Sequence, residues 1–382
     1  MDVPASLLDF SLVQGTLPGR RSRRRTRPHR ASRSVRILVL TLVSWLPLLA
    51  LSLWDGGPEQ TRAFLRDVAT QVAFLVSLPL LVASEPYIDE RLSAAVRQFV
   101  VAELVEPKDL PTFERIANNV VRLRRSVVIE AGLLAVSIAV SFLDVPRLTS
   151  RPAWLHAQPQ GPLTLAGWWY LAVSMPLLRF LLFRWLWRGV LWARFLFKVS
   201  RLPLALVPTH PDAAGGLGFL GTVQASFSLI VLALAATLTT HRLSHAPSND
   251  ISDYALHLFA FALLCLVVVF APLLSFFRVL LRAKRRGDHD YSAVAAWHSQ
   301  RFEQRWFHQK MPDGLDPLSA EDFSSLTDLG TSFNAARRMR WFPVDLRAAV
   351  AVVAAAMAPM VPLLVADRRF LEVLLELGKS LH

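Results

Sequence analysis

Four polar side chains lie inside long apolar runs, each four to six residues from the nearest polar or glycine-containing end of its run. They are Glu130, Arg179, Gln224 and Arg278. This spacing corresponds to a depth of about 6 to 9 Å along a helix. Ionisable groups in an apolar span are costly and usually face a partner or water. The sequence therefore predicts a polar layer, with Glu130 paired to Arg179, that lines a vestibule for a small ion. A purely structural ion pair whose long side chains reach the interface predicts the same residues.

A glycine-rich segment over 209–221, THPDAAGGLGFLG, contains the pattern G-x-G-x-x-G. Dinucleotide binding by that pattern needs a preceding strand in a βαβ unit, and the flanking sequence predicts none. The segment instead predicts a tight turn whose amide groups, at a helix start, could bind an anion, a phosphate or a lipid headgroup. The residues of this turn are His210, Asp212, Gly215, Gly216 and Gly218. Alternatively, the glycines serve only to let two helices pack closely.

The residue types give little indication of a metal site or a catalytic site. Five candidate ligands occur close together: His241, His245, Asp250, Asp253 and His257. A metal site needs three or four converging ligands, and two histidines near the end of a span are more often solvated. No nucleophile with a neighbouring base and no pair of carboxylates inside a run is found. No metal and no cofactor are therefore expected, and an enzyme is disfavoured.

These polar groups are positioned by seven apolar runs that approach or exceed the roughly 20 residues a helix needs to cross a bilayer. The runs cover 37–54, 68–84, 126–143, 164–186, 217–240, 254–281 and 346–366. Backbone groups in lipid must be hydrogen-bonded internally, so such runs form helices. The predicted fold class is all-α, a polytopic transmembrane helical bundle of about seven spans. The composition agrees, with 53% hydrophobic and 19% charged residues. Cys265 is the only cysteine, which excludes a disulfide framework.

The distribution of basic residues predicts the orientation. If the amino terminus is cytoplasmic and every run crosses, 33 Lys and Arg lie on the cytoplasmic side and 8 on the other side. This is the positive-inside signature. The carboxyl-terminal segment is then outside, unless Pro359 and Pro362 make the last run re-entrant. The first run is expected to remain as an anchor, because it and its basic leader are longer than a signal peptide usually carries.

The predicted organisation has three parts. Residues 1–36 form a basic leader with nine arginines and no apolar periodicity, which predicts disorder. Residues 37–366 form the membrane domain, including helical hairpins at 85–125 and 283–345 on the cytoplasmic side. Residues 367–382 form an amphipathic tail. A further basic, apolar stretch at 188–202 predicts a helix on the surface of the cytoplasmic leaflet.

The expected partners follow from charge and hydropathy. They are the lipid bilayer and anionic lipids, which the basic stretches Arg20–Arg36 and Arg188–Arg201 would attract. Self-association into a homo-oligomer is a further alternative. Nucleic acid is not expected, because no aromatic residues are interleaved with the arginines of the leader.

Three strings together resemble a family of uncharacterised bacterial multi-pass inner-membrane proteins. They are SLPLLVASEPYIDERL (Ser77–Leu92), HPDAAGGLGFL, and SSLTDLGTSFNAARRMRWFPVD (Ser324–Asp345). The resemblance extends from about residue 37 to the end. It implies a bacterial inner-membrane location and a shared architecture, and it brings no activity, substrate or catalytic residue.

Two functional classes are favoured over a third, an enzyme that acts on a lipid-borne substrate. The first is a channel or transporter for a small ion or solute, with a basic lining that favours anions. The second is a membrane scaffold or sensor whose cytoplasmic hairpins bind a protein partner or anionic lipid.

Overall fold

The computed structural model describes residues 4, 7, 10–12, 30–143, 153–156, 161–245, 251–308 and 321–360. In these residues the regular structure is helical, and the only strand-like pairings are isolated bridges from Val105 to Leu204 and from His156 to Leu163. The all-α fold class is confirmed.

The helices follow one another along the chain, with π and 3-10 turns marked η. They are α2 (Arg30–Arg66), α3 (Val68–Val72), η1 (Ala73–Ser77), α4 (Leu78–Val101), η2 (Pro107–Asp109), α5 (Leu110–Arg124), α6 (Val127–Leu143), η3 (Ala153–Leu155), α8 (Leu165–Trp169), η4 (Tyr170–Ser174), α9 (Met175–Val199), α10 (Phe219–Ala225), α11 (Ser228–His245), α12 (Ile251–Phe270), η5 (Ala271–Phe276), α13 (Phe277–Glu303), η6 (Gln304–His308), α14 (Glu321–Arg337), α15 (Leu346–Met357) and η8 (Ala358–Met360).

Five of the described helical stretches are long and apolar enough to cross a membrane. They are Arg33–Arg66, Val68–Val101, Leu165–Val199, Phe219–Thr240 and Phe259–Glu303. A sixth arises if α5 and α6, which meet at a 45° bend, are taken as one span. The number of span-length helices is therefore five to six, and the predicted count of about seven is not confirmed.

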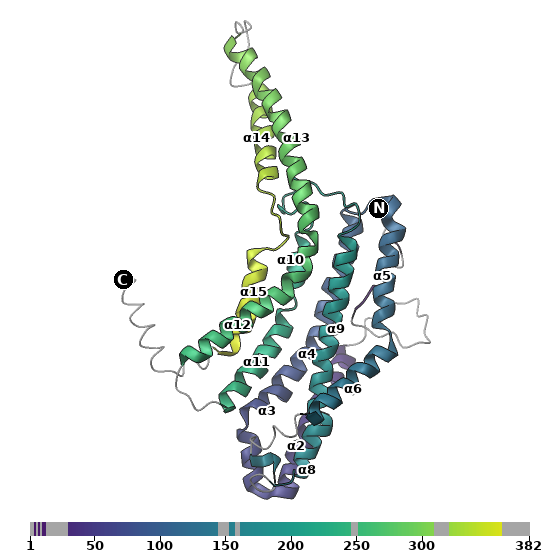
Figure 1. The fold of residues 1–382 in the computed structure, drawn as a ribbon, viewed down its shortest axis with the longest axis vertical. Coiled ribbons are helices and arrows are strands. Elements are labelled where there is room, and N and C mark those ends of the chain that lie inside the picture. The colour runs from purple at the N-terminus through teal and green to yellow at the C-terminus, as the bar shows by residue number, and fades with distance from the viewer. Residues whose placement is uncertain are drawn as a thin grey trace, which may run out of the picture.

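The predicted seventh span, 346–366, corresponds to the short apolar helix Leu346–Met360. Its described part is about 22 Å long at 1.5 Å per residue, against the roughly 30 Å of a bilayer core, and residues 361–366 of the predicted run lie outside the described residues. It packs against α11 and α12, as Figure 1 shows. Residues 361–382, which include the predicted tail, lie outside the described part of the chain.

The described helices form an elongated bundle with a projecting arm (Figure 1). At one end α13 and α14 pack against each other and extend well beyond the other helices. At the opposite end α2 packs against α8. Helices α4 and α9 contact each other in the middle of the molecule. Both begin at the α2–α8 end and run toward the arm, so residues on their facing sides can meet inside the bundle.

Helices α4 and α9 begin with the same sequence device. Each follows a π-helical turn, and the strings at the junctions are nearly the same, VSLPLL over 76–81 and VSMPLL over 173–178. Proline lacks the N–H that would continue the helical ladder, and a π turn is a common way to accommodate such a break. The serine two residues before each proline donates its hydroxyl hydrogen to a neighbouring helix. Ser77 bonds the carbonyl of Ala233 at 2.9 Å, and Ser174 bonds that of Ser44 at 2.7 Å.

Aromatic side chains form a core at the end of the bundle nearest the arm. The ring of Phe99 in α4 lies 5.8 Å from that of Phe113 in α5 and 6.4 Å from that of Phe195 in α9. It also lies 5.3 Å from the ring of Phe219 and 6.5 Å from that of Phe276. Aromatic pairs at these separations add stabilisation beyond their buried area. The core therefore holds α5, α9, α10 and η5 together around α4.

Two predictions about basic segments are wrong. Parts of the leader are ordered, because Leu7, Phe10 and Leu12 are buried against the bundle and residues from Arg30 onward belong to α2. Residues 13–29 lie outside the described part. The stretch 188–202 does not form a separate surface helix, because α9 continues to Val199 and the side chain of Arg188 is buried.

Candidate functional site

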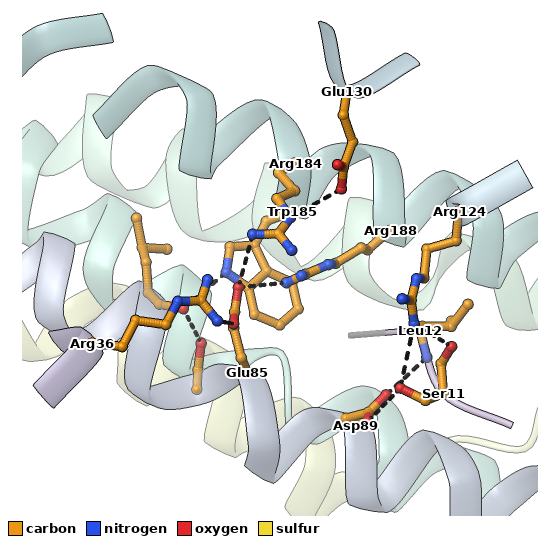
Figure 2. Close-up of polar contacts among 12 residues, drawn as sticks. Ser11, Leu12, Arg36, Glu85, Asp89, Arg124, Glu130, Arg184, Trp185 and Arg188 are labelled. Carbon is orange, nitrogen blue, oxygen red and sulfur yellow. Dashed lines mark hydrogen bonds and ion pairs between the residues drawn. The ribbon is translucent and has the colours of Figure 1, made fainter. Parts of the chain in front are cut away.

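The carboxylate of Glu85 in α4 is buried and lies within reach of three arginines (Figure 2). Its Oε2 atom is 2.8 Å from Nη1 of Arg36. Its Oε1 atom is 3.1 Å from Nη1 of Arg188 and 3.5 Å from Nη1 of Arg184. We call Glu85, Arg36, Arg184, Arg188 and Glu130 the Glu85 cluster.

The cluster is assembled from helices that are distant in sequence. Arg184 and Arg188 are four residues apart in α9, so their side chains lie on one face of the helix. The guanidinium of Arg188 stacks 4.7 Å from the ring centre of Trp185, and Trp185 donates its indole N–H to the carbonyl of Leu81 at 3.0 Å. These contacts hold α9 in register with α4, one helical turn before Glu85.

Positive charge exceeds negative charge within the cluster. Three guanidiniums surround the single buried carboxylate, and the second carboxylate, Glu130, is 51% exposed. Its Oε1 atom lies 3.9 Å from Nε of Arg184, which is too long for a hydrogen bond. The Nε atom of Arg184 is buried and has no hydrogen-bond partner in the described residues. Arg188, Arg184 and Arg36 are 3%, 19% and 47% exposed, so the excess of guanidinium charge is only partly shielded from water. An anion would stabilise such an excess.

The four residues of the predicted polar layer do not converge on one place. Glu130 lies near Arg184, and the predicted pairing with Arg179 does not form. Arg179 donates to Oγ of Ser141 at 2.9 Å. Arg278 is exposed.

Gln224 is buried in a local network of its own. It accepts the indole N–H of Trp192 at 3.2 Å and donates to the carbonyl of Val269 at 2.8 Å. These contacts join α9, α10 and α12, so Gln224 connects helices in the structure.

The predicted anion-binding turn already contains an anion of its own. The carboxylate of Asp212 accepts backbone N–H groups from Ala214 at 2.8 Å, Gly216 at 3.1 Å and Gly218 at 2.7 Å. Nδ1 of His210 also lies 2.8 Å from this carboxylate. These amides are therefore not free for an external phosphate or headgroup. Gly215 and Gly216 adopt positive φ angles of 65° and 97°, which explains why glycine occupies both positions.

The turn is charged and fastened to the segment before α15. Burial acts to raise the pKa of Asp212, but the three backbone donors and His210 outweigh it, so the pKa lies below its ordinary value. Arg340 donates its side chain to the carbonyl of Asp212 at 2.9 Å and its backbone N–H to the carbonyl of Ala213 at 2.7 Å. The turn thus has a structural role, because it is bonded to Arg340 at the base of the arm.

The histidines and aspartates near 241–257 contribute no described site. The side chains of His241 and His245 lie outside the described part. Elsewhere in that part, no group of three or more His, Cys, Asp or Glu could hold a metal ion.

Sequence reasoning missed Glu85 because residues 85–125 were assigned to a separate hairpin, whereas α4 runs unbroken from Leu78 to Val101. A signal was present. Glu85 and Asp89 share a helical face with the buried apolar residues Ile88, Leu92 and Val96. A carboxylate on an apolar helix stripe requires a buried partner, and that expectation leads to arginines on other helices.

Comparison of the chain with protein-family models, with curated proteins and with solved structures found no match.

Proposed function

We propose that this chain is a multi-pass protein of the bacterial inner membrane that conducts or transports a small anion past the Glu85 cluster. The single observation that carries the proposal is the buried Glu85 carboxylate shared by three guanidiniums. Ionisable groups within membrane helices are rare and commonly mark ion or substrate pathways. The excess of arginine favours an anion over a cation.

The chemistry suits a small oxyanion. A guanidinium presents parallel N–H donors that match the two oxygens of a carboxylate or phosphate. Glu85 occupies the place of such a ligand on Arg184 and Arg188. An incoming anion would replace the Glu85 carboxylate on these arginines, which would release α4 from α9 locally. Arg36 is 47% exposed, so the cluster has one arginine that contacts solvent or headgroups.

The proposed orientation places the amino terminus and the arm in the cytoplasm. The positive-inside rule supports it, because the segments at that end carry most of the Lys and Arg. Cysteines introduced on the arm and near residue 59 would test it, since a membrane-impermeant thiol reagent added to intact cells should label only the latter.

Flux into liposomes tests the transport proposal. Purified protein is reconstituted, and the movement of chloride, phosphate, nitrate and acetate is followed. Flux of at least one anion should fall by about tenfold or more in Arg188→Gln, since each 1.4 kcal/mol of lost stabilisation is a factor of ten. Arg194→Gln is the matched control, because Arg194 is an exposed arginine of the same helix. Absence of flux for every anion, or an equal loss in the control, would overturn the proposal. If Arg188→Gln does not fold, Arg184→Gln serves instead.

The second candidate function is a membrane scaffold or sensor. It is favoured by the α13–α14 arm, which extends beyond the bundle and exposes Val294, Trp297 and Phe307. Exposed apolar side chains of this size commonly mark interaction surfaces. A protein partner that co-purifies in a fixed ratio, and is lost from Trp297→Asp, would support this function. Binding to anionic vesicles that depends on the arginine-rich leader would support its lipid-binding form.

A further inference from the structure

An amino-terminal segment, described at residues 4, 7 and 10–12, is held against α4 and α5 by contacts to the main chain of residues 10–12, and Figure 2 shows those of Ser11 and Leu12. Oδ1 of Asp89 accepts the N–H of Leu12 at 2.8 Å. Ser93 donates its hydroxyl hydrogen to the carbonyl of Phe10 at 2.7 Å, and Arg124 donates to the carbonyl of Ser11 at 2.9 Å. Three side chains of the bundle thus bind three consecutive residues of the segment through atoms that every peptide has.

The side chains of the segment supply the apolar part of the contact. Leu7, Phe10 and Leu12 are 0%, 3% and 0% exposed. The ring of Phe10 lies 5.7 Å from that of Phe195 in α9, which belongs to the aromatic core. Ser11 donates its hydroxyl hydrogen to the other carboxylate oxygen of Asp89 at 2.7 Å. We call Asp89, Ser93, Arg124 and Phe195 the peptide seat.

We propose that the peptide seat is a binding site for a short peptide, and that the amino-terminal segment that carries Leu7 and residues 10–12 is its tethered and exchangeable ligand. The ligand class is a peptide with large apolar side chains in the places of Leu7, Phe10 and Leu12, and a hydroxyl in the place of Ser11. Leu12 is separated from the start of α2 by a connection that can span up to about 60 Å when extended.

Tethering explains why the chain's own segment occupies the seat. A linked ligand acts at an effective concentration that can reach the millimolar range, so a free peptide must compete with it. Occupancy also has a consequence for the neighbouring charges. Asp89 lies one helical turn after Glu85 on α4, so release of the segment would uncover Asp89 and Arg124 beside the Glu85 cluster. The proposal concerns peptide binding and does not depend on anion transport.

Binding of the segment in trans tests the proposal. The protein lacking residues 2–12 is titrated with a peptide of residues 1–15 that carries a fluorophore at its carboxyl end, and anisotropy is measured. We expect saturable binding with one peptide per chain, and affinity at least about tenfold weaker for the full-length protein, whose own segment competes. A control peptide with Phe10→Ala and Leu12→Ala should not bind.

Substitutions in the seat make the test specific. Asp89→Asn in the truncated protein should weaken binding by about tenfold or more, because it removes a charged acceptor of two hydrogen bonds. Glu90→Gln is the matched control, since Glu90 is the exposed neighbour on the same helix. The proposal is overturned if the truncated, folded protein does not bind the peptide, if both peptides bind equally, or if the full-length protein binds as well as the truncated one.

If the truncated protein does not fold, a cleavable full-length protein tests whether the segment exchanges with free peptide. A protease site is inserted after Gly15, and the purified protein is cut once it has folded. Exchange of the cut segment for an excess of labelled peptide over hours supports an exchangeable ligand. A cut segment that stays without exchange, or that leaves and is not replaced, shows that the segment is a permanent part of the bundle and overturns the proposal.

Discussion

Nη1 of Arg188 lies 3.1 Å from Oε1 of Glu85, and the two side chains are only 3% and 5% exposed. Taking two such charges out of water costs several kcal/mol for each ion, and the cost is recovered only while both stay paired. The pair joins the two helices that contact each other in the middle of the bundle. Its disruption should therefore affect stability in a way that exposed ion pairs of the same helices do not.

Glu85→Gln should lower the free energy of unfolding by about 3 kcal/mol, because it leaves buried guanidiniums without their carboxylate. Denaturant unfolding of the purified protein in detergent, followed by tryptophan fluorescence, measures the change. Glu90→Gln, on the exposed side of α4, should change it by less than about 0.5 kcal/mol. Equal stability of the two variants would contradict a structural role for the Glu85 carboxylate.

Glu85→Met combined with Arg188→Met should be less destabilising than the sum of the two single substitutions. Each single change strands a buried charge, whereas the double change removes both members of the pair. A double-mutant cycle in detergent should give a coupling energy of about 1 to 3 kcal/mol. In Arg188→Met the Glu85 carboxylate still has Arg184 and Arg36 nearby, whereas Glu85→Met removes the carboxylate from all three arginines. Glu85→Met should therefore be the more costly single change. A coupling energy near zero would mean that the two groups do not interact.

Asp212→Asn should destabilise the base of the arm at neutral pH by about 1 to 2 kcal/mol, because a neutral amide accepts the three backbone N–H groups less well. The pKa of Asp212 is lowered in the folded protein. Its contribution to stability is therefore fully present above the unfolded pKa of about 3.9 and is lost as the pH falls through the lower folded pKa.

Melting temperatures of the wild type and Asp212→Asn, measured across acidic pH, should accordingly converge below that range. Asp290→Asn is the control, because Asp290 is exposed and pairs only with Arg286 in the described residues. A difference between wild type and Asp212→Asn that persists at the lowest pH would show that ionisation of Asp212 is not the cause.

Lys284→Met should loosen the end of α14. The ammonium group of Lys284 donates to the carbonyls of Arg337 and Met339, both at 2.7 Å, at the place where α14 ends. The loss of a charged donor at a helix carboxyl terminus is worth about 1 kcal/mol. Hydrogen exchange of residues 333–339 should become several-fold faster, whereas Arg285→Met, on an exposed neighbour, should leave it unchanged. Unaltered exchange in Lys284→Met would show that the lysine does not hold this end.

Helical structure and its approximate positions were predictable because apolar runs and helix-breaking residues act locally. Pro107 begins the short turn η2 between α4 and α5, and Pro111 lies in the first turn of α5. The described helices cover every predicted run at least in part. The number of spans was less predictable. Whether Leu346–Met360 crosses a bilayer depends on its length and on its packing against α11 and α12, and hydropathy alone does not contain this packing.

The Glu85 cluster and the peptide seat could not be predicted in the same way. Arg36 and Arg188 are 49 and 103 residues from Glu85, and Leu12 is 77 residues from Asp89. The sequence contains many arginines and does not indicate which of them pairs with a given carboxylate. The leader has no apolar periodicity that would predict burial of Leu7 or Phe10.

Hydropathy along the chain was sufficient to predict a helical protein whose apolar helices are long enough to cross a membrane, because hydropathy is an average over neighbouring residues. The pairing of Glu85 with Arg188, the filling of the glycine-rich turn by Asp212 and the binding of Leu12 by Asp89 arise only in the folded chain. Each depends on which helices pack together, and packing is decided by the shape of all the side chains at once.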